Sequence, residues 1–224
     1  ARGGSKRSTN KTIKLFPGKP LIAYSIGVAH ATGLFDRIIV STDSKEIAEI
    51  ARRYGAEVPF LRPAQLADDF TGTDEVVLHG LEWLLEHGVP VDYVCCIYAT
   101  APLIRAEYVK MGFKILKEKQ ATSVFSVTSY DFSIYRALVI TKNGKVRMKW
   151  PKYLNSRSQD LPVAYHDAGQ FYWADVRKYL VEKRFYSKNA FPVIIPRYLV
   201  QDIDTEEDWK TAELLYKALY KKND

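Results

Sequence analysis

The sequence has 224 residues, of which 47% are hydrophobic and 26% are charged. At roughly 100–200 residues per domain, this length fits one large domain or a domain with an appendage, and the apolar content excludes a disordered chain. The formal net charge of +7 allows a nucleic acid, a phosphorylated small molecule or an acidic substrate as partner. The only cysteines, Cys95 and Cys96, are adjacent, which excludes a disulfide framework and favours a reduced, cytoplasmic setting. No apolar run reaches the ~18 residues of a membrane span.

The first half of the chain alternates helical and strand-like apolar patterns. Helical spacing is found at residues 20–32, 44–55, 73–87 and 102–119, and short apolar runs typical of strands lie at 37–41, 93–98 and 123–127. Ser44 and Thr73 are predicted to cap the second and third helices. This alternation predicts a three-layer, Rossmann-like α/β domain with a mixed, mostly parallel sheet.

The pattern changes after Tyr130. Residues 136–140 and 145–149 flank Asn143–Gly144, a strong signal for a hairpin turn, and residues 150–162 are polar and lack periodicity. The α/β rhythm then returns, with helices predicted at 175–183 and 206–220 and a strand at 193–198. We therefore expect an arm, residues 131–163, to be inserted in a domain made of residues 1–130 and 164–224.

The first 19 residues contain six lysines and arginines and no acidic residue. Gly3–Gly4 lies among these cations, and glycines let backbone N–H groups approach phosphate oxygens while the cations neutralise their charge. A Walker-type loop, with Gly-Lys-Ser/Thr directly before a helix, is absent. A polyphosphate site and a solvated basic arm that touches nucleic acid non-specifically both remain open from these residues alone.

Two carboxylates flank one apolar residue in Asp202–Ile203–Asp204. On a strand, residues i and i+2 point to the same face, so the pair would share one divalent cation. Alternatively, Asp202 ends a strand, and Thr205 with Asp208 forms a capping box for the last helix. A further polar stretch near residues 157–170 is not a hydrolase triad, because no nucleophile elbow surrounds its serine.

Together these segments resemble the cytidylyltransferases that activate nine-carbon acidic sugars. The resemblance is carried in chain order by residues 1–7, which look like the family's phosphate loop, and by 18–22, 40–43, 62–69 and 201–205. Residues 95–102 and 165–173 look most like the branch that acts on pseudaminic acid. The sialic acid enzymes typically carry Gln at the position of Tyr98.

The sequence departs from the family pattern in its phosphate loop. That loop usually follows a hydrophobic strand, whereas this sequence begins at the loop, so we expect that strand to be missing from the sequence given. The family also commonly has Pro after the Lys-Arg pair and ends the loop with Lys-Asn. Here the loop continues as Ser8-Thr9-Asn10-Lys11-Thr12, which retains the lysine.

The resemblance implies transfer of CMP from CTP to the anomeric hydroxyl of pseudaminic acid, with release of pyrophosphate. Transfer to sialic acid (N-acylneuraminate) is the runner-up. The implied nucleotide-binding residues are Ala1, Arg2, Gly3, Gly4, Lys6, Lys11, Arg62 and Thr73. The implied Mg²⁺ ligands are Asp202 and Asp204, which are the expected catalytic residues together with Arg2 and Lys11. The implied sugar-binding residues are Tyr98, Arg157, Gln159, His166 and Gln170.

The arm is rich in apolar residues, and an isolated hairpin is marginally stable in water, so its surface needs a partner. We expect a homodimer with shared active sites, in which each arm packs on the other subunit, as the resemblance also implies. We expect CTP and an acidic nine-carbon sugar as substrates, and neither nucleic acid nor a membrane as partner. The rival interpretation, a basic nucleic-acid-binding α/β protein, gives no reason for Asp202 and Asp204 to be paired.

Overall fold

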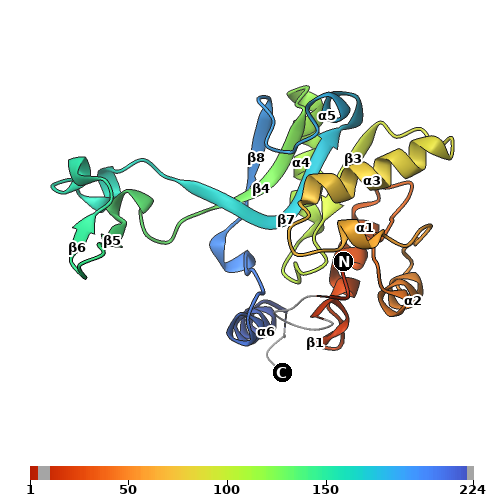
Figure 1. The fold of residues 1–224 in the computed structure, drawn as a ribbon, viewed down its shortest axis with the longest axis horizontal. Helices are drawn as coiled ribbons and strands as arrows, with labels where there is room; N and C mark the ends of the chain where they lie inside the picture. Colours follow the sequence, from red (N-terminus) through yellow and green to blue (C-terminus); the bar gives the residue numbers. More distant parts are fainter. Residues whose placement is uncertain (5–10, 221–224) are drawn as a thin grey trace.

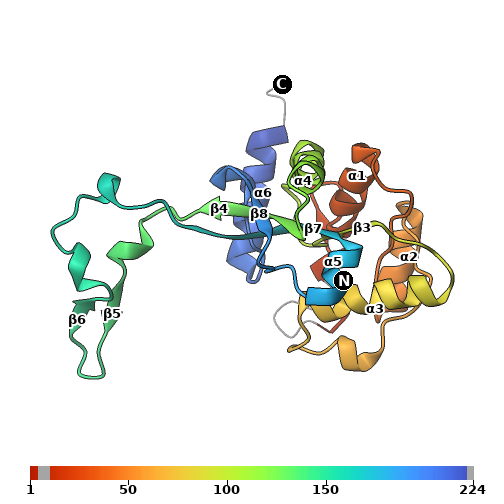
Figure 2. The same ribbon diagram turned by 90° about the horizontal axis from the view of Figure 1, so that it is seen from above.

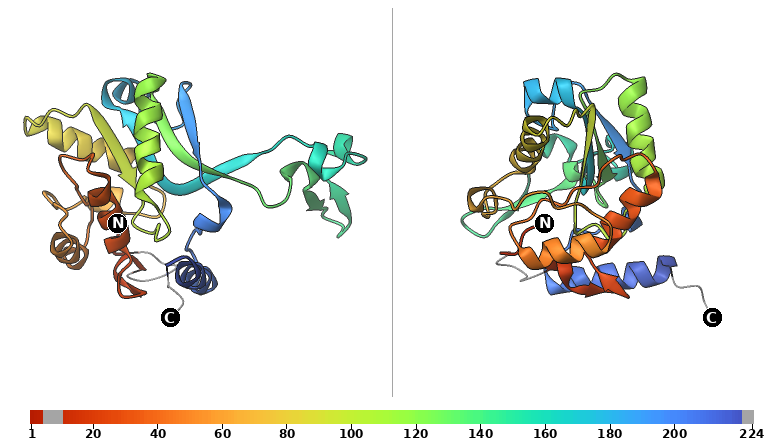
Figure 3. Two further views of the ribbon diagram at one scale, coloured as in Figure 1. Left: turned by 180° about the vertical axis from the view of Figure 1, so that it is seen from behind. Right: turned by 90° about the vertical axis from the view of Figure 1, so that its right-hand side faces the viewer.

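The computed structural model describes residues 1–4 and 11–220, and its centre is a four-stranded sheet (Figure 1). The strands lie in the order β3 (Tyr93–Ile97), β7 (Tyr165–Asp175), β4 (Ser123–Ser129) and β8 (Ala190–Ile194). Helix α4 (Ala106–Glu118) covers one face, and α3 (Thr73–Glu86) and α5 (Val176–Glu182) cover the other (Figure 3). The domain is therefore a three-layer α/β structure, as the alternating pattern predicts.

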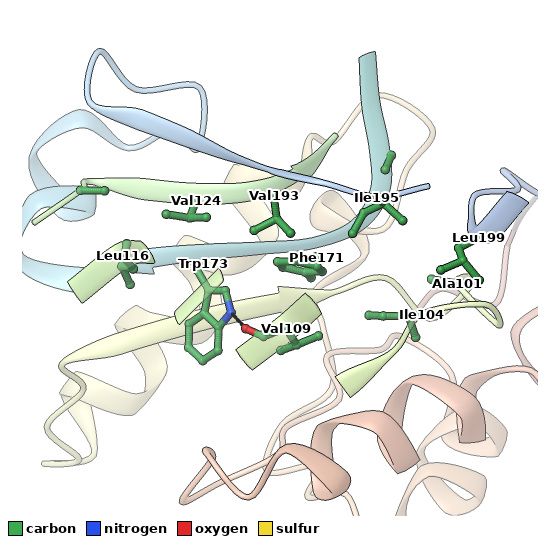
Figure 4. Close-up of a cluster of buried hydrophobic side chains, with 12 residues drawn as sticks. Ala101, Ile104, Val109, Leu116, Val124, Phe171, Trp173, Val193, Ile195 and Leu199 are labelled. Carbon is green, nitrogen blue, oxygen red and sulfur yellow. Dashed lines mark hydrogen bonds between the residues drawn. The ribbon is translucent and has the colours of Figure 1, made fainter. Parts of the chain in front are cut away.

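Strand β7 is buried on both faces over its second half, which explains its nearly unbroken apolar run. Because side chains alternate along a strand, Phe171 and Trp173 pack toward α4, and Tyr172 packs toward α3 and α5. The Trp173 indole donates a hydrogen bond of 2.9 Å to the carbonyl of Val109 in α4 (Figure 4). The helix approaches closely at Gly112, where an added Cβ would lie 2.8 Å from Phe171.

The sheet is mixed, but it contains more antiparallel pairing than the mostly parallel arrangement expected. Strand β7 runs antiparallel to both β3 and β4, whereas β4 and β8 are parallel. The chain leaves β4 at Ser129, passes through the arm and returns at Tyr165 beside the same strand. The inserted arm thus joins β4 to β7 in the way a long hairpin does, which requires antiparallel pairing.

The N-terminal part adds helices α1 (Ile22–Thr32) and α2 (Lys45–Arg53), and a short ribbon of β1 (Leu15–Phe16) and β2 (Lys19–Pro20). Among the described residues, the strand predicted at 37–41 is reduced to a single parallel bridge, between Ile39 and Glu57. One edge of this segment bonds to residue 57, and an apolar cavity of about 500 Å³ separates the other edge from β3.

A side chain that caps a helix is not free to contact a ligand, so the caps of α2 and α3 bear on the site. Ser44 caps α2 as predicted, since its side chain accepts from the Ile47 amide. Helix α3 is capped differently from the prediction: its N-cap is Gly72, whose amide donates to the Glu75 carboxylate at 2.9 Å. Thr73 is therefore the first helical residue, and its hydroxyl is free of a capping role. None of the described helices is both long and apolar enough to cross a membrane.

The inserted segment projects from the domain as an arm (Figure 2). Strands β5 (Leu138–Ile140) and β6 (Val146–Met148) form the predicted hairpin, whose turn contains Gly144 at φ +74°. Arg136 ties the arm together by donating to three backbone carbonyls between residues 153 and 156. Several apolar side chains of the arm are exposed in the single chain, including Leu138, Ile140, Val146 and Leu154.

Candidate active site

A cavity of about 690 Å³ opens at the carboxyl end of β3. We call it the site cavity. In open α/β sheets, ligands bind beyond the carboxyl ends of the strands. It is lined by the N-terminal residues, Arg62, the 69–73 loop with Val76 of α3, residues 96–100 and Asp204. Their side chains place cations, carboxylates and hydroxyls around one space.

The N-terminal segment is held at the cavity wall by contacts with two loops, one containing Asp43 and the other Asp69. The Gly3 amide donates to the Asp43 carboxylate at 2.9 Å, and the Arg2 guanidinium forms an ion pair of 2.7 Å with Asp69. Both partners of that ion pair are about one-third exposed, so the pair is weak and can exchange for a more strongly charged anion. Lys6, the other cation expected here, lies outside the described residues.

Lys11 links the N-terminal segment to the second acidic motif. It begins a short 3₁₀ helix (Lys11–Ile13), and its ammonium donates to the carbonyl of Ile203 and lies 3.6 Å from an Asp204 carboxylate oxygen. Its side chain is only 14% exposed. The structure thus brings together Arg2, Lys11 and Asp204, which are far apart in the sequence, around one cavity.

Asp202 and Asp204 do not lie on a strand, contrary to the strand geometry considered for them. They precede α6 (Glu206–Tyr220) in irregular backbone. Ile203 is 1% exposed and packs with Phe16 and Trp209, so it anchors the segment inward between the two carboxylates. Burial of this apolar residue keeps the acidic pair together without a strand.

The predicted capping box at α6 is present and also supports this segment. The Asp208 amide donates to the Thr205 hydroxyl at 3.2 Å, and the Thr205 amide donates back to the Asp208 carboxylate at 2.8 Å. The same carboxylate accepts from the Asp204 amide at 3.1 Å. Asp208 is therefore the residue that caps α6, and its carboxylate also holds the backbone at Asp204 in place.

The acidic pair fits a divalent cation chemically. Partial burial, followed by the charge of Asp204, raises the pKa of Asp202. A cation between the two carboxylates would offset this unfavourable negative charge. Among the described residues there is no group of three or more His, Cys, Asp or Glu side chains suited to a metal. In proteins, Mg²⁺ is usually bound by only one or two carboxylates, and substrate phosphates supply further ligands. Two carboxylates are therefore enough for a magnesium site of this kind.

Arg62 is a buried cation at the cavity wall. Its guanidinium donates to the hydroxyl and carbonyl oxygens of Ser41, at 3.0 and 2.6 Å, and to the Ala1 carbonyl at 3.2 Å. Burial lowers its pKa, but a guanidinium keeps its charge in proteins. Cys96 also lines the cavity; burial raises its pKa to about 12, which excludes a thiolate nucleophile at neutral pH.

The opposite wall carries two hydroxyl groups in direct contact. The Thr73 hydroxyl and the Tyr98 phenol are 2.5 Å apart, and both residues line the cavity. Burial raises the pKa of Tyr98, so the phenol stays protonated at neutral pH. Thr73 reaches this position because Gly72, one residue earlier, takes the cap of α3.

Four residues expected near the sugar do not line the site cavity of this chain. Arg157 and Gln159 belong to the arm, where Arg157 pairs with Asp160 at 2.8 Å. His166 is exposed where the arm joins β7, and its ring lies 4.8 Å from that of Tyr130. Gln170 is 3% exposed and donates to the Leu199 carbonyl at 2.6 Å, so it packs inside the domain.

The structure adds a loop that was not assigned a role from the sequence. The Asp68 carboxylate accepts hydrogen bonds from the Phe70 amide and from the amide and hydroxyl of Thr71, which lowers the pKa of Asp68. This turn presents Phe70 at the cavity, with its side chain 93% exposed. The available signal was a large aromatic residue between Asp68–Asp69 and Thr71–Gly72, a pattern typical of a turn that holds a ring outward.

Residues 1–223 match the protein family described as cytidylyltransferase. The chain is 42% identical over 218 residues to a pseudaminic acid cytidylyltransferase of Campylobacter jejuni subsp. jejuni serotype O:2, covering 97% of this chain and 94% of that protein. It is 33% identical over 217 residues to a CMP-N,N'-diacetyllegionaminic acid synthase of Legionella pneumophila subsp. pneumophila, covering 96% of this chain and 93% of that protein.

The fold is also similar to a solved structure of CMP:2-keto-3-deoxy-manno-octonic acid synthetase complexed with CTP. The TM-score is 0.70, and the match covers 98% of this chain and 96% of that chain at 13% sequence identity. Identity this low establishes a common fold and carries nothing further.

Proposed function

Because the chain belongs to the cytidylyltransferase family, we propose that it transfers CMP from CTP to the anomeric hydroxyl of pseudaminic acid and releases pyrophosphate. The observation that carries this proposal is the 42% identity to the Campylobacter jejuni relative over nearly the full length of both chains. The site cavity supports it, because Arg2, Lys11 and Arg62 border the same space as the Asp204 carboxylate, while Asp202 lies two residues away outside the lining. The two unbridged cysteines fit the reduced cytoplasm that we propose as its location.

In this reaction the anomeric oxygen attacks the α-phosphorus of CTP. A P–O bond forms to the sugar, the bond between the α-phosphorus and the bridging oxygen breaks, and the hydroxyl proton is released. Little covalent chemistry is left to the protein, which acts by positioning and by offsetting negative charge. We propose that Arg2 and Lys11, with Lys6, bind the triphosphate, and that the amides of Gly3 and Gly4 donate to its oxygens. Ala1, Arg62 and Thr73 complete the proposed nucleotide site.

We propose that Asp202 and Asp204 hold Mg²⁺. When bound, the ion would neutralise phosphate charge and lower the pKa of the attacking hydroxyl. The protein's own contribution is to hold Asp204 at the cavity wall, with Asp202 two residues before it, through the buried Ile203 and the Asp208 cap. Lys11 lies next to Asp204 and limits the repulsion between the pair and an incoming triphosphate.

We propose a homodimer in which the arm, residues 131–163, completes the partner's sugar pocket. Tyr98 lines the cavity of its own chain, whereas Arg157 and Gln159, which do not line it, lie on the arm that projects from the domain (Figure 2). In a two-fold dimer they would reach the neighbouring site, where Arg157 offers a cation to the sugar carboxylate. His166, at the base of the arm, would lie between the cavity of its own chain and the neighbouring site. Gln170 would act through the backbone, since its carbonyl accepts from the Tyr98 amide at 2.9 Å.

Lys11→Ala is expected to raise the KM for CTP by about 10- to 100-fold, the value of one charge-assisted hydrogen bond to phosphate. Steady-state kinetics with CTP varied at saturating sugar measure this. Lys14→Ala is the matched control, because Lys14 pairs with Glu206 at 3.1 Å and lies over the Trp209 ring, outside the cavity. Unchanged CTP kinetics in Lys11→Ala, with the control also unchanged, would remove Lys11 from the phosphate site.

The proposed function is tested by pyrophosphate release from CTP with a panel of acidic sugars. We expect the highest kcat/KM with pseudaminic acid, and lower values with sialic and legionaminic acids. A higher kcat/KM with sialic acid than with pseudaminic acid would mean that sialic acid is the substrate. No pyrophosphate with any sugar, together with salt-dependent binding to duplex DNA, would overturn the transferase in favour of a nucleic-acid-binding protein.

A further inference from the structure

One buried hydroxyl at the site cavity has no hydrogen-bond partner in the part of the chain that the structure describes. It belongs to Thr12, which is 6% exposed and whose side-chain oxygen Oγ1 is enclosed. Thr12 also lines the site cavity. The other described residues with a buried, unpartnered side-chain polar atom do not line this cavity; they are His79, Arg105, Ser133 and Gln170.

An enclosed hydroxyl without a partner is unfavourable for a folded chain. Burial removes it from water, and nothing replaces the hydrogen bonds that water gave it. Thr32, which is 4% exposed, shows the usual arrangement: its hydroxyl donates to the Ala29 carbonyl at 2.7 Å and accepts from the Leu34 amide at 3.2 Å. Valine resembles threonine in shape and lacks the hydroxyl, so valine at position 12 would avoid the cost. We therefore expect the Thr12 hydroxyl to serve a partner that enters the cavity from outside.

Contacts on both sides of Thr12 hold it at the cavity wall. Lys11, on one side, donates to the Ile203 carbonyl through its ammonium. Ile13, on the other side, packs against the apolar cluster between α1 and α2. The backbone at Thr12 is thereby anchored in two directions, and rotation about one torsion, χ1, is enough to redirect its hydroxyl.

The charges of the cavity indicate the chemistry of this partner. Arg2, Lys11 and Arg62 line the same space as Thr12, and cations gathered around one cavity favour an anionic ligand. A phosphate group presents several unprotonated oxygens that accept hydrogen bonds, and a threonine hydroxyl has one proton to donate. The Thr12 hydroxyl is therefore complementary to a phosphate oxygen.

We propose that the Thr12 hydroxyl donates a hydrogen bond to a phosphate oxygen of a nucleoside triphosphate bound in the site cavity. This inference rests on the proposed function, which supplies the triphosphate, and it adds a neutral donor to the cations already assigned. The ligand gives the buried hydroxyl the partner that it lacks in the free protein. Thr12→Val is therefore expected to stabilise the free protein and, at the same time, to weaken binding.

The test combines thermal unfolding of the free protein with calorimetric titration of CTP and of inorganic triphosphate, at one fixed Mg²⁺ concentration. Thr12→Val is expected to raise the melting temperature by about 2–4 °C and to weaken binding of both ligands about tenfold or more. Thr12→Ser keeps the hydroxyl and should bind both ligands about as tightly as the wild type. Thr32→Val is the matched control: Thr32 does not line the cavity, and loss of its two hydrogen bonds should lower the melting temperature and leave both affinities unchanged.

Any of the following results would overturn the inference. A lower melting temperature in Thr12→Val would mean that the hydroxyl stabilises the free fold, and unchanged affinities would mean that it does not contact the ligand. Weaker binding of CTP with unchanged binding of inorganic triphosphate would move the contact to the base or the ribose. Equal weakening in Thr12→Val and Thr12→Ser would mean that side-chain packing matters and the hydroxyl does not.

The inference and the proposed function fail in different ways. A wild-type protein that binds CTP but activates no sugar would refute the proposed function alone, and the titrations would still decide the role of Thr12. A Thr12→Val protein with wild-type affinities that still forms a CMP-sugar would refute this inference alone.

Discussion

Asp204→Ala is expected to lower kcat by about a thousandfold or more while the fold is retained. Removing one of two carboxylates that hold a divalent cation loses charge stabilisation of several kcal/mol in the transition state. Little stability should be lost, because Asp208 and Ile203 hold this segment through contacts that do not involve the Asp204 side chain. The measurement is kcat at saturating CTP and sugar over a magnesium titration, with circular dichroism as the check on folding.

Glu206→Ala is the control for this variant. Glu206 begins α6 two residues after Asp204, and its carboxylate is exposed and pairs with Lys14. Its loss should leave kcat unchanged. Near wild-type turnover in Asp204→Ala would contradict the metal assignment. A loss of only about 1 kcal/mol of stability with normal turnover would mean that the segment serves the helix start alone.

Ile140→Asp is expected to convert a dimer to monomers and to abolish most activity. Ile140 is 77% exposed in the single chain, so a charge there costs a monomer little, but the same charge is costly inside an apolar interface. Sedimentation and turnover are measured together. Val181→Asp is the control: Val181 is 83% exposed in α5, away from the arm. A wild-type monomer with full activity would contradict the dimer.

Shared sites make a stronger prediction for mixed dimers. An Arg157→Ala chain supplies an intact cavity, and an Asp204→Ala chain supplies an intact arm, so each mixed dimer has one complete site. Random mixing of two inactive variants should then restore about a quarter of wild-type activity, since half of the dimers are mixed and half of their sites are complete. No recovery on mixing would mean that Arg157 does not act in the partner's site.

Features that depend on local chain chemistry could be predicted from the sequence. The Asn143–Gly144 hairpin, the Ser44 cap and the Thr205–Asp208 capping box are all present, because each is decided within a few residues. At α3 the cap lies at Gly72, one residue before the Thr73 that the pattern predicts. Thr73 has the side chain of a good cap, but the tertiary contact with Tyr98 and the reach of Glu75 to Gly72 place the cap at Gly72.

Features that depend on distant segments could not be predicted from periodicity. Strand β7 pairs antiparallel with β4 because of where the arm returns, and apolar alternation carries no strand direction. The Lys11 ammonium lies 3.6 Å from an Asp204 carboxylate oxygen, although the two residues are far apart in the sequence. The resemblance implies a sugar-binding role for Gln170, and periodicity could not show that the fold buries its side chain against Leu199.

A protein that joins CMP to a nine-carbon acidic sugar must form a CMP-sugar and pyrophosphate in equal amounts. The most direct measurement is product analysis of CTP incubated with pseudaminic acid and Mg²⁺, using phosphorus NMR and mass spectrometry. We predict one CMP-sugar phosphodiester for each pyrophosphate released, and no reaction when the cation is chelated. Free CMP or CDP without the sugar phosphodiester, or CTP left intact with every acidic sugar, would contradict this activity.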